Sequence, residues 1–566
     1  MPNSIKKLEE AFKEGKYDQL LKDIYVDEAV IEYQQERYIK ALESFEKIYG
    51  EKEVEIYSAP GRSEVGGNHT DHQFGKVLAT SINLDAIAIV AKRDDDVIDL
   101  KSEGYERIIV SLSSFDPAKA EKGTSQALIQ GVASKLKEEG YKIGGFEAYV
   151  TSDVLNGAGM SSSAAFEVLI GNILSGLYND MKIDPVFLAQ AGQYAENVYF
   201  GKPCGLMDQM ASSIGGLINI DFEDPQSPKI KKVEVDFEEY GHSLCIVDTK
   251  GSHADLTDDY AAIPYEMKKV ANYFNQEALR EVDKDDFYLN LPKIREILGD
   301  RAVLRAMHLF EENKRVDQQV KALEEGDFDT FKKLIKESGD SSFKYLQNVY
   351  SSHDLTNQSV SIGLAISDIS LGDKGVSRVH GGGFAGTIQA FVPNDIVSMY
   401  KKNMEHVFGE GACHVLKVRP YGGMKVLYQR VVNVFTAEPM FRMDAGISRR
   451  FLRDRLNVCL ALNDIFHSAK TSSYSTMANR SLHYSFYNDR SFVQLSISFS
   501  LNNLKKPFKS RSGIETEKER IKGLLSKEIA GMLGLSVHTV NTHRQRILAK
   551  LNVNTVSYTH LTLPTT

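Results

Sequence analysis

One stretch carries more information about this chain than any other. Residues 59–72 read APGRSEVGGNHTDH and combine a turn signal, an arginine, two adjacent glycines and several hydrogen-bonding side chains. Apolar sequence typical of strands flanks the stretch at 54–57 and 77–82. Because α/β enzymes place their chemistry in short polar loops between buried strands, we predict a functional loop here. A hairpin loop with an accidental polar cluster is the alternative.

A second polar loop, LNGAGMSSSAA, occupies residues 155–165. Gly157 and Gly159 allow a tight turn and a close approach to a ligand. The serines at 161–163 then open a predicted helix, whose N-terminal amides suit a phosphate group. The loop lacks the Gly-Lys-Ser/Thr ending of a Walker loop. A Gly/Ser linker is the alternative, but the strand before the loop and the helix after it argue against one.

A third glycine-rich loop, VHGGGFAGT, spans residues 379–387 and formally matches the pattern GxGxxG. A dinucleotide-binding fingerprint also needs an acidic residue about 20 positions later, at the end of the next strand. Here a predicted strand, 388–392, follows at once, which disfavours that interpretation. We expect Gly381, Gly382 and Gly383 to let the backbone approach a bound ligand.

A single acid stands in apolar sequence between the second and third loops. Asp208 lies among Leu206, Met207 and Met210, after a Pro-Cys-Gly turn. A carboxylate held there loses much of its hydration and needs a cationic partner. We predict that this partner is Arg62. A purely structural ion pair is the alternative.

Composition restricts the classes of function. The 566-residue chain has a net charge of −9, which disfavours a role in coating nucleic acid or membrane surfaces. Its four cysteines lack metal-ligand spacing and fit a reducing compartment. The N-terminus has no apolar signal core, and no apolar run is long enough to span a membrane as a helix. A cytoplasmic location is expected.

The three loops and the Asp208 segment, in this order and spacing, resemble the GHMP kinase superfamily and, within it, the galactokinase family. The resemblance covers about residues 20–428. It implies an α/β fold, more specifically an α+β two-domain GHMP kinase fold. In that fold an N-terminal ribosomal-protein-S5-like domain precedes a C-terminal ferredoxin-like domain. We expect an N-terminal helical segment at 1–50, the first kinase domain at 51–220 and the second at 221–428.

The resemblance also implies an activity, which is transfer of the γ-phosphoryl group of ATP to the anomeric hydroxyl of galactose with Mg²⁺. It assigns catalytic roles to Asp208 and Arg62, and Mg²⁺ ligation to Ser162 and Glu196, although any of the serines 161–163 fits that role. The residues expected to bind the sugar are Asn68, His69, Asp71, Gly205 and Tyr260. Those expected to bind ATP are Gly157, Ala158, Gly159, Met160, Ser161, Ser162, Ser163 and Ala164.

The chain departs from the family pattern around the sugar motif. Ser63 and Glu64 replace the usual Val-Asn pair, Asn68 replaces a Glu, and His72 replaces a Tyr. Further on, residues 263–264 are Ile-Pro where two arginines are usual. Galactose remains the first expectation because His69 and Asp71 persist. Another hexose or an amino sugar is the alternative, and the sequence does not indicate an oligomeric state.

The pattern of apolar and polar residues changes after about residue 428. Residues 429–510 alternate apolar and polar side chains, as in 456–462 and 493–501, which predicts β-strands. The segment resembles the last strands of outer-membrane receptor barrels, with too few strands to close a barrel by itself. A water-soluble antiparallel sheet is the alternative.

Residues 515–553 have helix-turn-helix spacing and resemble the DNA-binding module of LuxR-type regulators, through residues 536–543. Residues 556–566 fit no regular element and look like translated non-coding sequence. We interpret the region after 428 as pieces of unrelated genes joined to a kinase, by gene fusion or by assembly error. The alternative function is a sugar-responsive transcriptional regulator, with a kinase-like sensor and a DNA-binding output.

Overall fold

Strand β3 (Lys76–Lys92) lies in the middle of the first sheet of the computed structural model and is buried on both faces. Ala86, Ala88 and Val90 belong to one hydrophobic core, whereas Ile87 and Ile89 belong to another. Successive side chains of a strand point to opposite faces, so a strand that is covered on both sides needs a continuous apolar run.

The structure describes residues 3–154, 159–202, 204–251 and 256–427, and after them the backbone of strands between 436 and 499. The chain divides into two compact units, Met1–Gln429 and Arg430–Thr566.

The first sheet has the strand order β1-β2-β3-β6-β4-β5, with β7 paired to β3, β8 paired to β7 and β13 paired to β2. All these pairs are antiparallel except β4 with β6. The remaining strands of the sheet are β1 (Asn3–Ser4), β2 (Glu53–Gly66), β4 (Val97–Ser102), β5 (Arg107–Ser111), β6 (Phe146–Ser152), β7 (Leu217–Asp221), β8 (Lys229–Val233) and β13 (Met424–Lys425).

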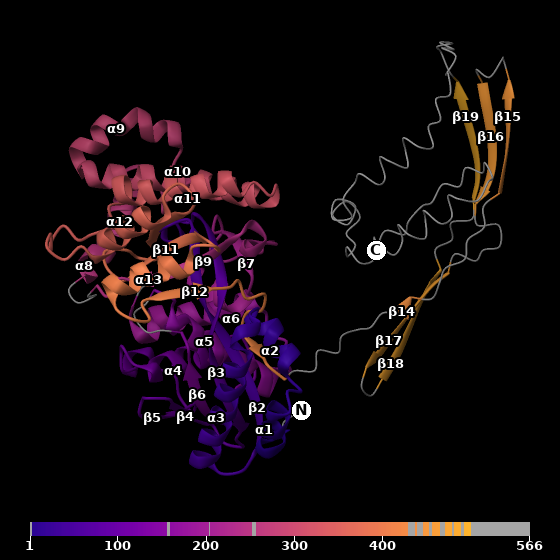
Figure 1. Ribbon diagram of the computed structural model, residues 1–566, viewed down its shortest axis with the longest axis horizontal. Helices are drawn as coiled ribbons and strands as arrows, with labels where there is room; N and C mark the ends of the chain where they lie inside the picture. The colour runs from indigo at the N-terminus through magenta and orange to yellow at the C-terminus, as the bar shows by residue number, and fades with distance from the viewer. Residues whose placement is uncertain are drawn as a thin grey trace. The chain divides into compact units, whose positions relative to one another are not determined.

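Helices cover both faces of this sheet (Figure 1). The core on one face includes side chains of α1 (Ile5–Lys13), α2 (Asp18–Tyr25) and α3 (Ile31–Tyr49). The core on the other face includes side chains of α4 (Ser125–Glu138), α5 (Ser162–Asn179) and α6 (Pro185–Tyr194). Helix α6 runs into a π-helical turn, Ala195–Phe200, and α7 spans Met207–Ile214.

The second sheet is antiparallel, with the order β10-β11-β9-β12. Its strands are β9 (His242–Asp248), β10 (Val376–His380), β11 (Thr387–Pro393) and β12 (Cys413–Leu416). The helices of this half are α8 (Thr257–Tyr273), α9 (Lys284–Leu298), α10 (Asp300–Glu324), α11 (Phe328–Ser341), α12 (Ser359–Leu371) and α13 (Val397–Phe408).

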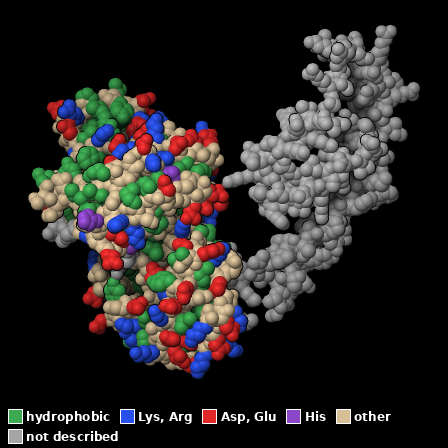
Figure 2. Space-filling model, in the orientation of Figure 1, with side chains coloured by type: hydrophobic (Ala, Val, Ile, Leu, Met, Phe, Trp, Pro, Cys, Tyr) green, Lys and Arg blue, Asp and Glu red, His purple; other side chains and the backbone are tan. Residues whose placement is uncertain are grey.

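A shared core joins the two sheets. Leu244 and Ile246 of β9 lie in the same cluster as Val65 of β2 and Leu78 of β3. The alternate residues of β9, Cys245 and Val247, instead face a core with α12 and α13. On the face drawn in Figure 2, acidic and basic side chains are interspersed over the described unit.

The predicted mixed α/β architecture is confirmed, but the interpretation of residues 59–72 as one loop between strands was wrong. Strand β2 continues to Gly66, so Arg62 lies on a strand. The register of β2 against β3 shifts between Pro60 and Arg62 and again between Glu64 and Gly66. Such irregularities bend a strand without ending it, and a polar sequence can therefore stay in the sheet. Similarly, the predicted strand 77–82 is part of the longer strand β3.

Strands also occur in the second unit, as the alternating sequence predicts. β15 (Ala445–Phe451), β16 (Leu456–Asn463) and β19 (Phe492–Phe499) form one antiparallel sheet. β14 (Thr436–Ala437), β17 (Lys470–Met477) and β18 (Arg480–Tyr487) form another. The predicted helix-turn-helix at 515–553 and the segment 556–566 lie outside the described residues. Within the described part of the chain, no helix is long and apolar enough to cross a membrane.

A buried ionic cluster ties the N-terminal helices to the first sheet. Asp85 is fully buried and pairs with Arg37 of α3 at 2.7 Å and with Arg419 at 2.9 Å. The Tyr25 hydroxyl of α2 donates to the same carboxylate at 2.9 Å. Burial alone would raise the pKa of Asp85, but the two arginines hold it below its ordinary value. One carboxylate therefore connects two helices, β3 and the segment that leads to β13.

Replacement of Asp85 by Asn should destabilise the protein by about 3–5 kcal/mol, because two buried arginines lose their counter-charge. Urea unfolding at neutral pH measures this cost. The matched control is Asp317→Asn, which removes a pair of Lys76 with a half-exposed carboxylate and should cost about 0–1 kcal/mol. Since the pKa of Asp85 is lowered in the folded state, its stabilisation is present above an unfolded pKa of about 3.9 and is lost as pH falls further. Equal costs for the two variants would contradict a structural role for the cluster.

Candidate active site

The centre of the candidate site is an ion pair between Arg62 of β2 and Asp208, the second residue of α7. Arg62 Nε donates to Asp208 Oδ1 at 2.6 Å, and Arg62 Nη2 donates to Oδ2 at 2.7 Å. The arginine side chain is buried, whereas 31% of the Asp208 side chain is exposed. Burial would raise the pKa of Asp208, but Arg62 and a hydrogen bond from Ser161 hold it below its ordinary value. The site thus keeps an ionised carboxylate with an open side.

The predicted phosphate loop lies against this pair. Gly157 and Ala158 lie outside the described residues. The carbonyl of Gly159 accepts a hydrogen bond from Arg62 Nη1, and the carbonyl of Met160 accepts one from the Arg62 amide at 3.2 Å. Ser161 has a left-handed backbone (φ 54°), and its hydroxyl donates to Asp208. Ser162 is the first residue of α5, so the free amides of this helix begin at the loop. Ala164 is buried in its first turn.

Glycine is required at position 159 for two reasons. Its φ is +66°, and a Cβ there would lie 2.4 Å from Thr387 Oγ1 of β11. The predicted phosphate loop therefore lies close to the last residue of the third glycine-rich loop.

The second acid of the site, Glu196, lies on the π-helical turn after α6 and is buried. Its Oε1 accepts a hydrogen bond from the Ser163 hydroxyl at 3.4 Å, and Lys202 Nζ is 3.5 Å away. Gln209 bridges Glu196 and Glu167 with two 3.0 Å hydrogen bonds from its amide nitrogen. Of the three serines, Ser163 rather than Ser162 reaches Glu196, while the metal-binding role of each stays a prediction.

The donor set fits Mg²⁺, because a hydroxyl and a carboxylate are hard oxygen ligands. The described residues contain no group of three or more His, Cys, Asp or Glu side chains placed to hold a metal ion by themselves. Mg²⁺ in phosphoryl-transfer sites is commonly bound by one or two protein groups, with water and substrate phosphates completing its shell. The pair of Ser163 and Glu196 matches that pattern.

Two of the predicted sugar-binding residues, Gly205 and Asp71, are in close contact just before the start of α7. A Cβ on Gly205 would lie 1.6 Å from Asp71 Oδ2, so the absence of a side chain at 205 makes room for that carboxylate. The Asp71 carboxylate also accepts a hydrogen bond from the His72 amide at 3.0 Å. This close contact explains a glycine at 205 by space alone, since its φ is not positive.

The third glycine-rich loop contacts the other three predicted sugar-binding residues. Asn68 donates to the Gly381 carbonyl at 2.7 Å, His69 Nε2 lies 3.0 Å from the Gly382 carbonyl, and the Tyr260 hydroxyl donates to the Gly383 carbonyl at 2.9 Å. Burial, together with His72, lowers the pKa of His69 to about 3, so its ring is neutral at physiological pH. The loop therefore holds these three predicted sugar-binding residues through consecutive backbone carbonyls.

Asn68 itself has no exposed surface. Its amide nitrogen also donates to Glu64 Oε1 at 3.0 Å. Relative to the family pattern, an amide and a carboxylate have exchanged places between positions 64 and 68, and the two side chains bond directly. Glu64 in turn pairs with Arg378 of β10, which is fully buried. The role of Asn68 in sugar binding stays a prediction.

Sequence reasoning assigned no role to several residues that hold this site together. His380 accepts a hydrogen bond from the Glu64 amide at 3.2 Å and lies 2.9 Å from Thr387 Oγ1. Arg378 bonds the Val65 carbonyl at 3.0 Å. A charged residue in an apolar strand was the signal for Arg378, because such a residue needs a buried partner. No local signal marked Asn348 or Gln209.

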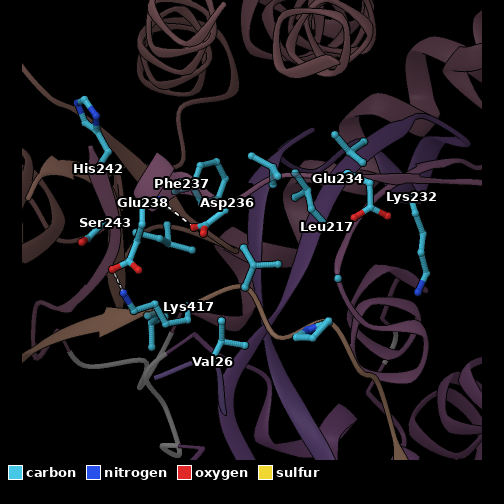
Figure 3. Close-up of a pocket in the computed structure, with 17 residues that line it drawn as sticks. Val26, Leu217, Lys232, Glu234, Asp236, Phe237, Glu238, His242, Ser243 and Lys417 are labelled. Carbon is cyan, nitrogen blue, oxygen red and sulfur yellow. Dashed lines mark hydrogen bonds and ion pairs between the residues drawn. The ribbon is translucent and has the colours of Figure 1, made fainter. Parts of the chain in front are cut away.

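A separate cavity of about 240 Å³ lies beside β8 and β9 (Figure 3). Its 17 lining residues include Lys232, Phe237, His242 and Lys417, and none of them is a predicted site residue. Glu238 and Lys417 form an ion pair across its lining. The cavity therefore does not belong to the candidate site.

The contact between Gly205 and Asp71 yields a test of the geometry. Gly205→Ala should cost about 1–3 kcal/mol of unfolding free energy, because the new methyl group overlaps the carboxylate. The same substitution in an Asp71→Ala background should cost much less, because the overlapping group is gone. Denaturant unfolding of the four proteins of this double-mutant cycle measures the coupling. The same cost in both backgrounds would show that the two residues are not in contact.

Comparison with known proteins identifies the architecture. Residues 127–216 match the GHMP kinases N terminal domain, and residues 43–92 match the galactokinase galactose-binding signature. A crystal structure of Lactococcus lactis galactokinase complexed with galactose has 26% sequence identity and a TM-score of 0.59. The match covers 68% of this chain and 98% of that one.

More distant structures match similar lengths. Mevalonate kinase of Methanococcus jannaschii is 16% identical, covering 64% of this chain and 98% of that one, with a TM-score of 0.46. A putative sugar kinase from Campylobacter jejuni is 14% identical, with a TM-score of 0.46. The match covers 66% of this chain and 97% of that one.

The region after 428 matches other families. Residues 426–500 match the outer membrane protein beta-barrel family, and residues 518–560 match the luxR family of bacterial regulatory proteins. The predicted resemblances of the tail are confirmed by these matches. The first part of the chain is therefore similar to GHMP kinases of the galactokinase type, and the part after residue 428 is similar to two further families.

Proposed function

We propose that the chain transfers the γ-phosphoryl group of ATP to the anomeric hydroxyl of galactose or a closely related hexose. The observation that carries the proposal is the ionised, partly open carboxylate of Asp208, held by Arg62 beside a glycine- and serine-rich loop at a helix N-terminus. The galactose-binding signature at 43–92 supports the sugar class.

In the proposed step, the anomeric oxygen forms a bond to the γ-phosphorus while the bond from that phosphorus to the β,γ-bridging oxygen breaks. ADP leaves with the electron pair of that bond, and the hydroxyl proton passes to Asp208. Since the pKa of Asp208 is lowered, this carboxylate is a weak base. Its main effect is to orient the hydroxyl, and it accepts the proton as the bond to phosphorus forms.

Arg62 has two effects in this proposal. It keeps Asp208 ionised through two hydrogen bonds, and its buried charge helps offset the negative charge of the transferring group. The backbone between Gly159 and Ala164 and the N-terminus of α5 would bind the ATP phosphates. Mg²⁺, held by Ser162 or Ser163 together with Glu196, would neutralise charge between the β- and γ-phosphates.

On the sugar side, Asp71 supplies a carboxylate and Gly205 supplies an open backbone beside it. His69 is neutral, so it offers one donor and one acceptor rather than a charge. Tyr260, on α8, closes the group through its contact with the third loop. Neutral and anionic groups of this kind suit the hydroxyls of a hexose. An amino sugar is the alternative substrate, because Asp71 also suits an ammonium group.

Asp208→Asn should lower kcat with galactose by roughly 10²- to 10⁴-fold, because the substituted amide cannot accept the hydroxyl proton. A coupled assay for ADP formation measures turnover, and the thermal transition checks folding. The matched control is Asp329→Asn, which removes a surface carboxylate that is 94% exposed. Undiminished turnover in a folded Asp208→Asn protein would sink the catalytic assignment.

A second function is favoured by the luxR match at 518–560. In this alternative the kinase-like unit senses a sugar and the C-terminal segment binds DNA. Gel-shift of the full chain on random duplex DNA should then show saturable binding that weakens steeply with salt, as phosphate contacts do. If the kinase proposal alone is correct, the same assay shows no saturable binding.

A further inference from the structure

Three consecutive backbone carbonyls of the third glycine-rich loop accept hydrogen bonds from side chains of the sugar side. Gly381 bonds Asn68, Gly382 bonds His69, and Gly383 bonds Tyr260. The loop can bend in this way because all three residues are glycines. A Cβ on Gly382 would lie 2.6 Å from the Tyr260 ring, and one on Gly383 would lie 2.0 Å from the Asn348 carbonyl.

Asn348 lies behind this row of carbonyls and is fully buried. It follows the π-helical turn Ser342–Leu346, which continues α11. Its amide nitrogen donates to Asn68 Oδ1 at 2.8 Å and to the Gly382 carbonyl at 3.2 Å. The backbone carbonyl of Asn348 accepts a hydrogen bond from the Phe384 amide at 2.5 Å. One side chain therefore bonds both the sugar motif and the third loop.

These bonds converge on His69. Asn68 is its neighbour in the chain, and Gly382 supplies the carbonyl that its ring bonds. His69 also has a left-handed backbone (φ 55°), a conformation that needs support from its surroundings. Asn348 holds both the residue that precedes His69 and the group that fixes the His69 ring.

We propose that Asn348 is a positioning residue for sugar binding, which acts on His69 through Asn68 and Gly382. Asn348 affects the tautomer of the His69 ring as well as its position. A carbonyl only accepts, so its bond with Gly382 puts the His69 proton on Nε2 and leaves Nδ1 as an acceptor. Asn348 thereby helps to fix the tautomer in which Nδ1 accepts a hydrogen bond from a sugar hydroxyl. This inference rests on the proposed function.

The test is Asn348→Leu in the full chain, because leucine keeps a similar volume and removes both donated bonds. The galactose KM and the galactose dissociation constant, the latter measured calorimetrically without ATP, should both rise about tenfold, the scale of one lost hydrogen bond of about 1.4 kcal/mol. The KM for ATP and kcat should stay within about twofold.

A milder variant protects the test against misfolding. Ser342→Ala removes a 3.2 Å hydrogen bond to the same Asn68 oxygen and should shift galactose affinity in the same direction by a smaller factor. Ser367→Ala is the matched control, since it removes a buried hydroxyl that bonds Tyr400 at 2.8 Å outside this network. It should leave the galactose KM unchanged.

The outcomes separate the two proposals. A wild-type chain that binds galactose without turnover overturns the kinase function, and the affinities of the variants still decide the role of Asn348. Equal changes in galactose and ATP constants, or a galactose shift of the same size in Ser367→Ala, would overturn the positioning role. A wild-type chain that binds no galactose overturns both.

Discussion

The part-buried ion pair between Arg62 and Asp208 is the interaction on which the site depends. Removing two charges from water costs several kcal/mol per ion, and their attraction offsets that cost only in good geometry. Here the guanidinium meets the carboxylate with two hydrogen bonds of 2.6 and 2.7 Å, and Gly159 accepts from its remaining nitrogen. The pair therefore requires β2, α7 and the phosphate loop to meet at one place. A small error in any of them would leave a buried charge without its partner.

Strand β2 meets this requirement because it crosses between the two halves of the domain. On both sides of the bulge at Pro60 and Arg62, its residues pair with β3 inside the first sheet. Immediately after Arg62, Ser63 and Glu64 bond Gln389 and Arg378 of the second sheet. Arg62 is thus held in the first sheet, and the side chains that follow it also bond the second sheet. Polar residues that looked like a loop in the sequence are a strand because their backbones pair with β3, while their side chains bond the other half.

The sequence could predict what depends on local pattern. The glycine and serine spacing predicted a loop that opens a helix, which is α5, and an isolated acid in apolar sequence predicted the partner of Arg62. It could not predict contacts whose residue types carry no local signature. Asn68 and Asn348 are 280 positions apart and bond inside the protein, and only the assembled fold shows that Asn68 is buried. Similarly, the sequence does not distinguish between adjacent serines. Only the start of α5 determines that Ser163 reaches Glu196.

The exchange of an amide and a carboxylate between positions 64 and 68 follows from the same packing. Arg378 is fully buried and its charge needs a carboxylate, which Glu64 supplies. A second carboxylate at 68 would lie beside Glu64 and would face the Gly381 carbonyl, so it would add repulsion where Asn68 now donates two hydrogen bonds. The neutral side chain at 68 is therefore required by the charge at 64. The predicted sugar-binding residues consequently include a carboxylate at Asp71 and a neutral ring at His69, and the Gly382 carbonyl of the third glycine-rich loop positions the ring.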